Sequence, residues 1–311
     1  MPDTADEQPA TLNETRAEAL RLTGRNYATI RHLLVQQPRG SATRPSTLGT
    51  MVTARKHRAL LLYLMLLTLW PVLKTRREPF EGALWARLLS TETGGMPWTP
   101  SDVSKAWGDL VRLDLVSRTR EGRALRVSPR REDGKADWTQ PGLAAKDRAE
   151  TYFVLPGVFW TNNDFAKLSF PALAMLLIIA AETSATSEVR LTQDLTADWY
   201  GISASTMKTG IQDLDELGLV NRRPQQVKAK LSPTGATTHW WYSLTGAYSF
   251  TARTEARNLA RTERATRQRR LAAKKAAAGK KAAVAKKSSS KRTTTKAAAK
   301  KAQPTRSPRP K

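Results

Sequence analysis

The sequence predicts a mainly helical α+β fold in which one order of helices and a small β-hairpin occurs twice, followed by a basic tail. First, residues 205–222, "STMKTGIQDLDELGLVNR", and residues 101–118, "SDVSKAWGDLVRLDLVSR", share seven identities at a spacing of 104 positions. Second, 311 residues leave room for about two cores plus tails. Third, 21 of the 52 basic residues but only two of the 27 acidic residues lie between Arg253 and Lys311, so this segment carries a formal charge of +19 and the rest of the chain +6.

Each copy is expected to begin with an apolar helix. The first apolar run extends from Ala59 to Leu73, and its 15 residues are fewer than the roughly 20 that a membrane span needs. In the second copy, "LSFPALAMLLIIAAE" offers Ser169 as an N-cap and Pro171 in the first turn. Both runs therefore predict buried helices of a protein with no membrane partner.

A helix, a turn and another helix follow in each copy. In the second copy, Thr192 and Gly201 bound one helix, while Ser203 caps the next helix and Gly218 ends it in the left-handed conformation. The residues expected to face inward there are Met207, Ile211, Leu214 and Leu217. In the first copy, "EGALWARLLS" predicts the first helix and Thr99 caps the second. Its inward residues are expected to be Val103, Trp107 or Ala106, Leu110 and Leu113.

Each copy ends in a predicted hairpin. The second hairpin has strand composition at Leu219–Arg222 and His239–Leu244, with a long basic loop between them. Trp240 and Trp241 alternate along its second strand, so one of them is expected in the core. The first hairpin, "LVSRTREGRALRV", is expected to turn tightly at Glu121 and Gly122.

These patterns place domain boundaries near residues 50, 135 and 250. The predicted order is an acidic and polar N-terminal region with a helix over 13–35 and then a linker (1–50), the first unit (51–135), a linker (136–150), the second unit (151–250) and the basic tail (251–311). The tail cannot bury an apolar face, so we expect it to be disordered when free and partly helical once phosphates neutralise its charge.

Composition argues against several classes of function. The chain has no Cys and three scattered His, which predicts no metal site and no disulfide framework. It contains no phosphate-binding G-x-x-x-x-G-K-[ST] loop and no H-E-x-x-H motif, so we expect neither an enzyme nor a cofactor. The acidic start "MPDTADEQPA" is unlike a signal peptide and predicts a cytoplasmic protein.

The stretch "YGISASTMKTGIQDLDELGLVNRR" resembles the recognition-helix region of the winged helix-turn-helix superfamily of DNA-binding proteins. Residues 98–120 resemble it less closely, because Asp114 stands where the second copy has Gly218. The resemblance implies two winged helix-turn-helix domains in tandem. Their implied role is that of a transcription regulator or nucleoid-associated protein bound to double-stranded DNA.

Two further resemblances bear on function. Tandem winged helices led by an F-x-L-P segment, here "FVLP", also resemble replication initiators of plasmids and phages, which implies the alternative of an initiator that binds repeated origin sites. The segment "AAKKAAAGKKAAVAKK" is similar to the tails of linker histones and of some bacterial nucleoid proteins. A basic tail also binds RNA, which stays an alternative polyanion.

The residues predicted to contact DNA are polar or basic and lie on the two second helices, the two hairpins and the tail. In the second unit they are Ser203, Ser205, Thr206, Lys208, Thr209, Gln212, Arg222, Arg223, Lys228 and Lys230. In the first unit they are Ser101, Ser104, Lys105, Arg112, Arg118, Arg120, Arg123 and Arg126. In the tail they are Arg253, Arg257, Arg261, Arg264, Lys274, Lys275, Lys280 and Lys281. Because Asp102 and Asp109 would repel phosphates, the alternative role of the first unit is to form a homodimer or to pack against the second.

Overall fold

A computed structural model describes residues 8–38, 40–121, 124–142 and 148–263, and the short segments 265–266, 268–270 and 272–273. By its internal contacts the chain divides into two units, Met1–Arg257 and Asn258–Lys311. The described residues form an α+β fold in which helices predominate and the sheets are small and antiparallel, as the sequence predicts. The domain boundaries predicted near 50, 135 and 250 stay a prediction.

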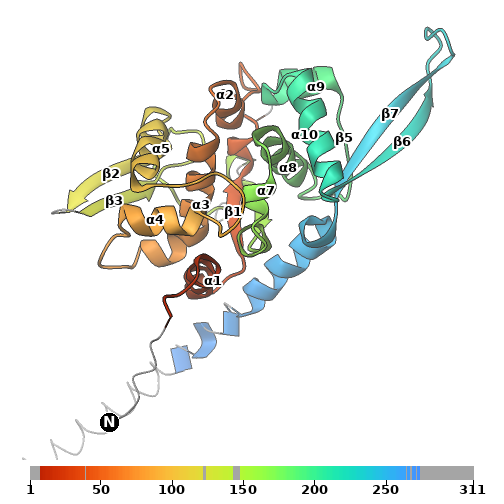
Figure 1. Cartoon of the computed structure of the whole chain (residues 1–311). Helices are drawn as coiled ribbons and strands as arrows, with labels where there is room; N and C mark the ends of the chain where they lie inside the picture. Colours follow the sequence, from red (N-terminus) through yellow and green to blue (C-terminus); the bar gives the residue numbers. More distant parts are fainter. Residues whose placement is uncertain are drawn as a thin grey trace, which may run out of the picture. The chain divides into compact units, whose positions relative to one another are not determined.

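The first half of Met1–Arg257 contains the first copy of the repeated order (Figure 1). Its elements are α1 (Leu12–Thr23), β1 (Tyr27–Arg31), the 3-10 turn η1 (His32–Leu34), α2 (Thr47–Thr53), α3 (His57–Leu73), α4 (Gly82–Leu89), α5 (Pro100–Arg112), β2 (Val116–Glu121) and β3 (Ala124–Pro129). The helix expected over 13–35 is shorter than predicted, because Gly24 caps α1 in the left-handed conformation and the buried strand β1 follows.

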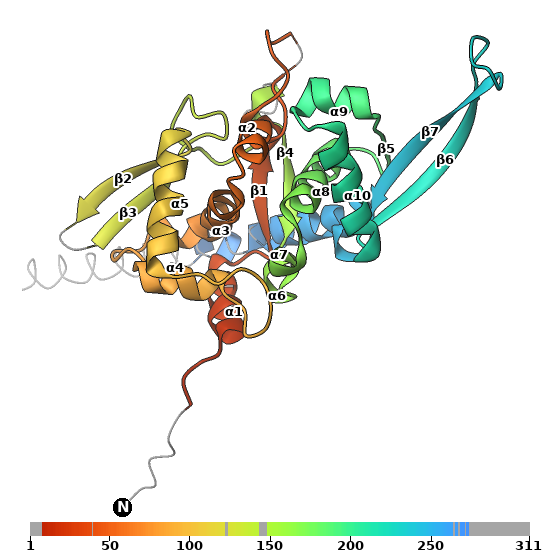
Figure 2. The same ribbon diagram turned by 45° about the horizontal axis from the view of Figure 1, so that its top comes forward.

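The second half repeats that order in α8, α9, α10 and a hairpin. Its elements are η2 (Arg148–Glu150), β4 (Tyr152–Pro156), α6 (Val158–Thr161), α7 (Asp164–Lys167), α8 (Phe170–Glu182), β5 (Val189–Arg190), α9 (Gln193–Tyr200), α10 (Ala204–Glu216), β6 (Val220–Lys228), β7 (Ala236–Leu244) and η3 (Gly246–Tyr248). A helix then begins at Phe250. Figures 1 and 2 both show β2–β3 and β6–β7 on opposite sides of α3 and α8.

The apolar helices α3 and α8 form the centre of the core, as predicted. Every residue of α8 from Ala172 to Ala181 is buried, and so is every residue of α3 from Ala59 to Leu69. The two helices begin close together, because the His57 ring stacks on Phe170 with centroids 4.8 Å apart. Among the residues described, no helix is both long and apolar enough to cross a membrane.

The strands that precede each copy hold the two copies together. β1 and β4 pair antiparallel, with Thr29 opposite Val154 at the centre, and the first of these strands lies within the region predicted as N-terminal helix and linker. One hydrophobic cluster includes Ile30, Leu64 and Met175 and therefore spans both copies. The two copies thus share apolar packing in addition to a common chain.

A buried ion-pair network fastens β1 to the segment between the copies. Arg31 is fully buried, and its Nη1 donates to Glu132 Oε2 at 3.0 Å while its Nη2 donates to Glu150 Oε2 at 2.8 Å. The Glu132 side chain is equally buried, and burial raises the pKa of that carboxyl although Arg31 acts against the shift. Removing Arg31 would leave the Glu132 carboxylate uncompensated in the core, and removing Glu132 would leave Arg31 with Glu150 alone, so the network specifies how the intervening segment docks.

Candidate nucleic-acid interface

The exposed face of α10 follows from how its two ends are capped and how its inner side packs. Ser203 is the N-cap, and its Oγ accepts a hydrogen bond from the backbone N–H of Thr206 at 3.2 Å. Gly218 ends the helix with φ of 67°, as the sequence predicts. Gly210 faces α8 so closely that an added Cβ would lie 2.4 Å from the carbonyl oxygen of Pro171. The opposite side of α10 is therefore the one left to solvent.

That outward side carries the residues predicted from the sequence. Ser203, Ser205, Lys208, Thr209 and Gln212 are exposed, and Thr206 is half-buried. Within the described part of the chain, the Lys208 side chain makes no hydrogen bond or ion pair. Leu217, in contrast, was expected to face inward and is 40% exposed, because it is the C-cap residue and lies beyond the last turn that packs on α8.

The second hairpin is a much longer ribbon than predicted. Strands β6 and β7 pair without interruption from Val220 opposite Leu244 to Lys228 opposite Ala236, so most of the expected basic loop is strand. Pro224 is tolerated because β6 is the edge strand of the order β5-β7-β6. In Figures 1 and 2 this ribbon extends away from the helices. Lys228 and Lys230 are exposed near its far end.

The two faces of this ribbon carry different arginine and tryptophan pairs. On the face toward α10, the Arg222 guanidinium lies 5.7 Å from the centre of the Trp240 ring. On the other face, Arg223 donates from Nη2 to Glu188 Oε2 at 2.7 Å, and Trp241 Nε1 donates to Gln225 Oε1 at 2.7 Å. The hydrogen bond from Arg223 lowers the pKa of the Glu188 carboxyl.

Neither tryptophan lies in the core, which corrects the expectation from their alternation. Trp240 is 40% exposed and Trp241 is half-buried, whereas Tyr242 and Leu244 are the buried residues of β7. The physical reason is that the ribbon extends past the helices. Between Tyr242 and the tip of the ribbon, both of its faces are therefore partly open to solvent.

A groove of about 440 Å³ lies between α10 and the inner face of the ribbon. Its floor contains Met207 and Ile211 of α10, Leu191 and Tyr242, which are all buried. Its rim contains Lys208, Arg222, Trp240, Asp194 and neighbouring polar groups of α9. The arrangement offers Lys208, an indole and Arg222, whose Nε also pairs with Asp215 Oδ2 at 3.5 Å, beside an apolar floor.

The corresponding helix of the first copy, α5, carries its own counter-ions. Thr99 and Asp102 form a reciprocal capping box, and these hydrogen bonds, followed by the charge of Arg58, lower the pKa of the Asp102 carboxyl. Asp109 Oδ1 accepts from Lys56 Nζ at 3.0 Å and also forms an ion pair with Arg112. The two acids expected to repel phosphates are therefore paired. Ser101, Ser104 and Lys105 are exposed, and Arg112 is exposed but engaged with Asp109.

The hairpin of the first copy is short, and its cations divide into two groups. Arg118 and Arg120 are exposed on β2. Arg126 on β3 is half-buried and donates to the backbone carbonyls of Arg76 at 3.1 Å and Arg77 at 2.6 Å. It thereby fixes the loop after α3, in which Lys74, Arg76 and Arg77 are exposed and were not predicted as site residues. Arg123 lies outside the described residues.

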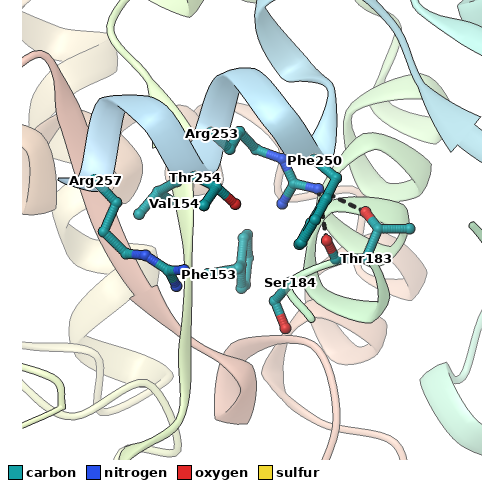
Figure 3. Close-up of a pocket in the computed structure, with 8 residues that line it drawn as sticks. All are labelled: Phe153, Val154, Thr183, Ser184, Phe250, Arg253, Thr254 and Arg257. Carbon is teal, nitrogen blue, oxygen red and sulfur yellow. Dashed lines mark hydrogen bonds between the residues drawn. The ribbon is translucent and has the colours of Figure 1, made fainter. Parts of the chain in front are cut away.

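The first cation assigned to the tail proves to be part of the core. Arg253 is 4% exposed, and its guanidinium donates to the carbonyls of Ala180 at 2.6 Å and Tyr248 at 2.8 Å. It also donates to the Thr183 carbonyl at 3.0 Å and to the Thr183 hydroxyl, and Figure 3 shows its bonds to Thr183. Burial, together with the nearby charge of Arg257, lowers the pKa of Arg253 to about 10. This side chain satisfies carbonyls at the end of α8 and is not free to meet a phosphate.

The other predicted tail residues are placed as follows. Arg257 lines the small pocket beside Arg253, and Arg261 is exposed in Asn258–Lys311. The remaining tail residues lie outside the described residues: Arg264, Lys274, Lys275, Lys280 and Lys281. Within the described ranges, no group of three or more acidic, His or Cys side chains could hold a metal ion.

Comparison with models of protein families, with curated proteins and with solved structures finds no match to this chain.

Proposed function

We propose that this chain is a double-stranded DNA-binding protein of the regulatory or nucleoid-associated kind, in which α8, α9, α10 and the β6–β7 ribbon act as a winged helix-turn-helix unit. The observation that carries the proposal is the outward side of α10. An α-helix fits the major groove of B-DNA, and recognition helices use their N-terminal half to reach base edges. Here that half presents Ser205, Lys208 and Thr209, which are exposed.

The ribbon supplies the neighbouring backbone contacts in this proposal. Its exposed Lys228 and Lys230, with Arg222 beside the groove, lie on the element that follows α10 directly. Contacts to phosphates fix the position of a protein on DNA but read no sequence. Specificity would therefore come from α10 and orientation from the ribbon.

The first copy is proposed to act as a second winged unit that contacts the DNA backbone. Its helix α5 ends in the same geometry as α10: the backbone N–H of Leu115 donates to Leu110 at 2.9 Å, and that of Leu219 donates to Leu214 at 2.8 Å. Asp114, with φ of 56°, takes the conformation of Gly218. This likeness of the backbone supports a tandem arrangement. Arg112 is paired with Asp109, whereas Lys105 on α5 and Arg118 and Arg120 on β2 are exposed and form no ion pair with another described residue.

The basic tail is proposed to add affinity without sequence preference. Each phosphate neutralised by a Lys or Arg contributes about 0.9 to the slope of log K against log salt. A segment with a formal charge of +19 can supply many such contacts. Arg253, which is buried in the core, anchors the start of this segment and does not count among them.

An origin-binding replication initiator is the second candidate. It is favoured by the pairing of β1 with β4, which joins the two helix-hairpin copies to one core and would hold two DNA contacts at one spacing. Footprinting on genomic fragments distinguishes the candidates. An initiator protects one array of evenly repeated sites, whereas a regulator or nucleoid protein protects many scattered sites.

The decisive test of duplex binding compares Lys208→Ala with Lys135→Ala in the full chain. Both changes remove one exposed lysine, but Lys135 lies after β3, outside α5 and the β2–β3 hairpin. At about 100 mM salt we expect Lys208→Ala to weaken duplex binding about five- to tenfold and to lower the salt slope by about 0.9. The control should bind as the unaltered protein does. Equal behaviour of the two variants would show that α10 does not contact DNA.

A further inference from the structure

The groove between α10 and the ribbon has the size and lining of a small-molecule site. Its volume of about 440 Å³ falls within the roughly 300 to 1,000 Å³ typical of ligand pockets. Its buried floor is apolar, whereas Lys208 and Arg222 are cations of its rim. A paired duplex exposes its backbone and its base edges, but it cannot place the flat face of a base in such a concavity, because its bases are stacked on one another.

Trp240 is the most unusual residue of this groove. It is a large apolar side chain left 40% exposed, and the Arg222 guanidinium lies 5.7 Å from its ring centre. Within the described residues, its indole N–H donates no hydrogen bond, whereas the adjacent Trp241 is anchored through Gln225 and lies beside Arg223. An exposed indole next to a guanidinium in a cationic groove is the combination on which proteins stack unpaired bases.

Asp194 adds a feature that phosphate binding alone does not explain. It is exposed on the first turn of α9 and lines the groove, and among the described residues it makes no hydrogen bond or ion pair from its side chain. The N-terminus of α9 favours a carboxylate there. A carboxylate repels a phosphate but accepts hydrogen bonds from the amino group of a base.

We propose that this groove binds one unpaired DNA base, which stacks on Trp240 while Lys208 and Arg222 hold the adjoining phosphates and Asp194 accepts from the exocyclic amino group. The inference rests on the proposed function, because the unpaired base belongs to the same DNA that α10 is proposed to bind in its paired form. The chain would then bind a duplex with a local opening more tightly than a closed duplex.

The test uses the full chain and two DNAs of the same length and flanking sequence, one fully paired and one with a central bubble of unpaired adenines. The measured quantity is the ratio of the two dissociation constants at one salt concentration. Contacts of the basic tail to phosphate change both constants alike and therefore cancel in this ratio. We expect the unaltered protein to prefer the bubble about tenfold, the effect of stacking one base on an aromatic side chain. Trp240→Ala should abolish this preference, and Trp240→Phe should retain most of it.

The matched control is Leu231→Ala. Leu231 is fully exposed in the connection between β6 and β7 and does not line the groove, so its loss should leave the bubble preference unchanged. Asp194→Ala should remove any preference for an adenine bubble over a thymine bubble, because thymine has no amino group. A bubble carrying 5-iodocytosine, which keeps an exocyclic amino group, should cross-link to Trp240 on irradiation, as located by mass spectrometry of the peptides.

The outcomes separate the two proposals. Equal affinity for bubble and duplex, or a bubble preference that survives Trp240→Ala, overturns the base site while duplex binding stands. Failure to bind the closed duplex with retention of the bubble preference overturns the proposed function and keeps the site. Binding to neither DNA overturns both.

Discussion

The two helix-hairpin copies repeat one order of elements but use their charged residues differently. Helices α5 and α10 are both 13 residues long and end in the same hydrogen-bonded turn. In the first copy, Lys56 and Arg112 are both paired with Asp109, so these two cations are engaged within the protein. In the second copy, Lys208 is unpaired within the described residues and the ribbon strands have nine residues each instead of six.

This difference teaches that a repeated pattern of Leu and capping residues specifies a backbone, whereas the partners of the charged residues specify what that backbone can bind. The shared identities Leu110, Leu115, Leu214 and Leu219 belong to the core or to its edge and are the same in both copies. The basic partners of Asp102 and Asp109 on α5 have no sequence signal of their own. They matter because Lys56, far along the chain from Asp109, folds back to within 3.0 Å of it.

The largest effect is expected where the two copies pack differently. Ala106 and Gly210 occupy corresponding positions, 104 residues apart. The first copy has a Cβ at this position, whereas in the second copy a Cβ added to Gly210 would meet the backbone of α8 at Pro171. Gly210→Ala should lower the free energy of unfolding by about 3 kcal/mol through overpacking. Gly108→Ala, on α5, should raise it by up to about 1 kcal/mol, because Ala is the better helix former and the site is open. Urea unfolding followed by circular dichroism measures both; equal stability of Gly210→Ala would disprove the close contact.

A smaller effect, on affinity, tests whether both hairpins contact DNA. The double variants Arg118→Ala with Arg120→Ala and Lys228→Ala with Lys230→Ala each remove two exposed cations from one hairpin region. Each should weaken duplex binding about tenfold or more at about 100 mM salt and reduce the salt slope by about 1.8. If the first copy instead forms a dimer, its double variant will bind DNA normally and change the sedimentation of the protein.

The smallest effect tests the turn after each helix. Gly218→Asp places in the second copy the residue that the first copy has at the same left-handed position, Asp114, but without the arginine that pairs with Asp114. It should lower the free energy of unfolding by about 1 kcal/mol. Asp114→Gly should change stability less, because relief of its backbone strain is offset by loss of the ion pair with Arg130 at 2.9 Å. Thermal unfolding of the two variants compares the turns directly. A cost as large for Asp114→Gly as for Gly218→Asp would mean that the ion pair dominates.

Much of the local structure could be predicted because it depends on neighbours in sequence. The caps at Ser203 and Thr99, the stop at Gly218 and the burial of α3 and α8 follow from side-chain type and periodicity. The ribbon could not be predicted to its full length. Its outer pairs join residues with no apolar alternation, such as Gln226 opposite Thr238, so strand pairing alone extends it.

The sequence by itself determined the repeated order of elements, the ends of α10 and the concentration of charge in the tail, because caps, periodicity and composition act over a few residues. Only the tertiary structure decided which charges remain available. The sequence predicts Arg253 as the first cation of a polycationic segment, but its guanidinium donates hydrogen bonds to carbonyls at the end of α8 that no helical N–H satisfies. One of Trp240 and Trp241 was expected in the core, but neither lies there, and the ribbon places Trp240 at the rim of a groove. Such outcomes depend on contacts between residues that are far apart in the sequence, and a local sequence pattern does not show which distant residues will meet.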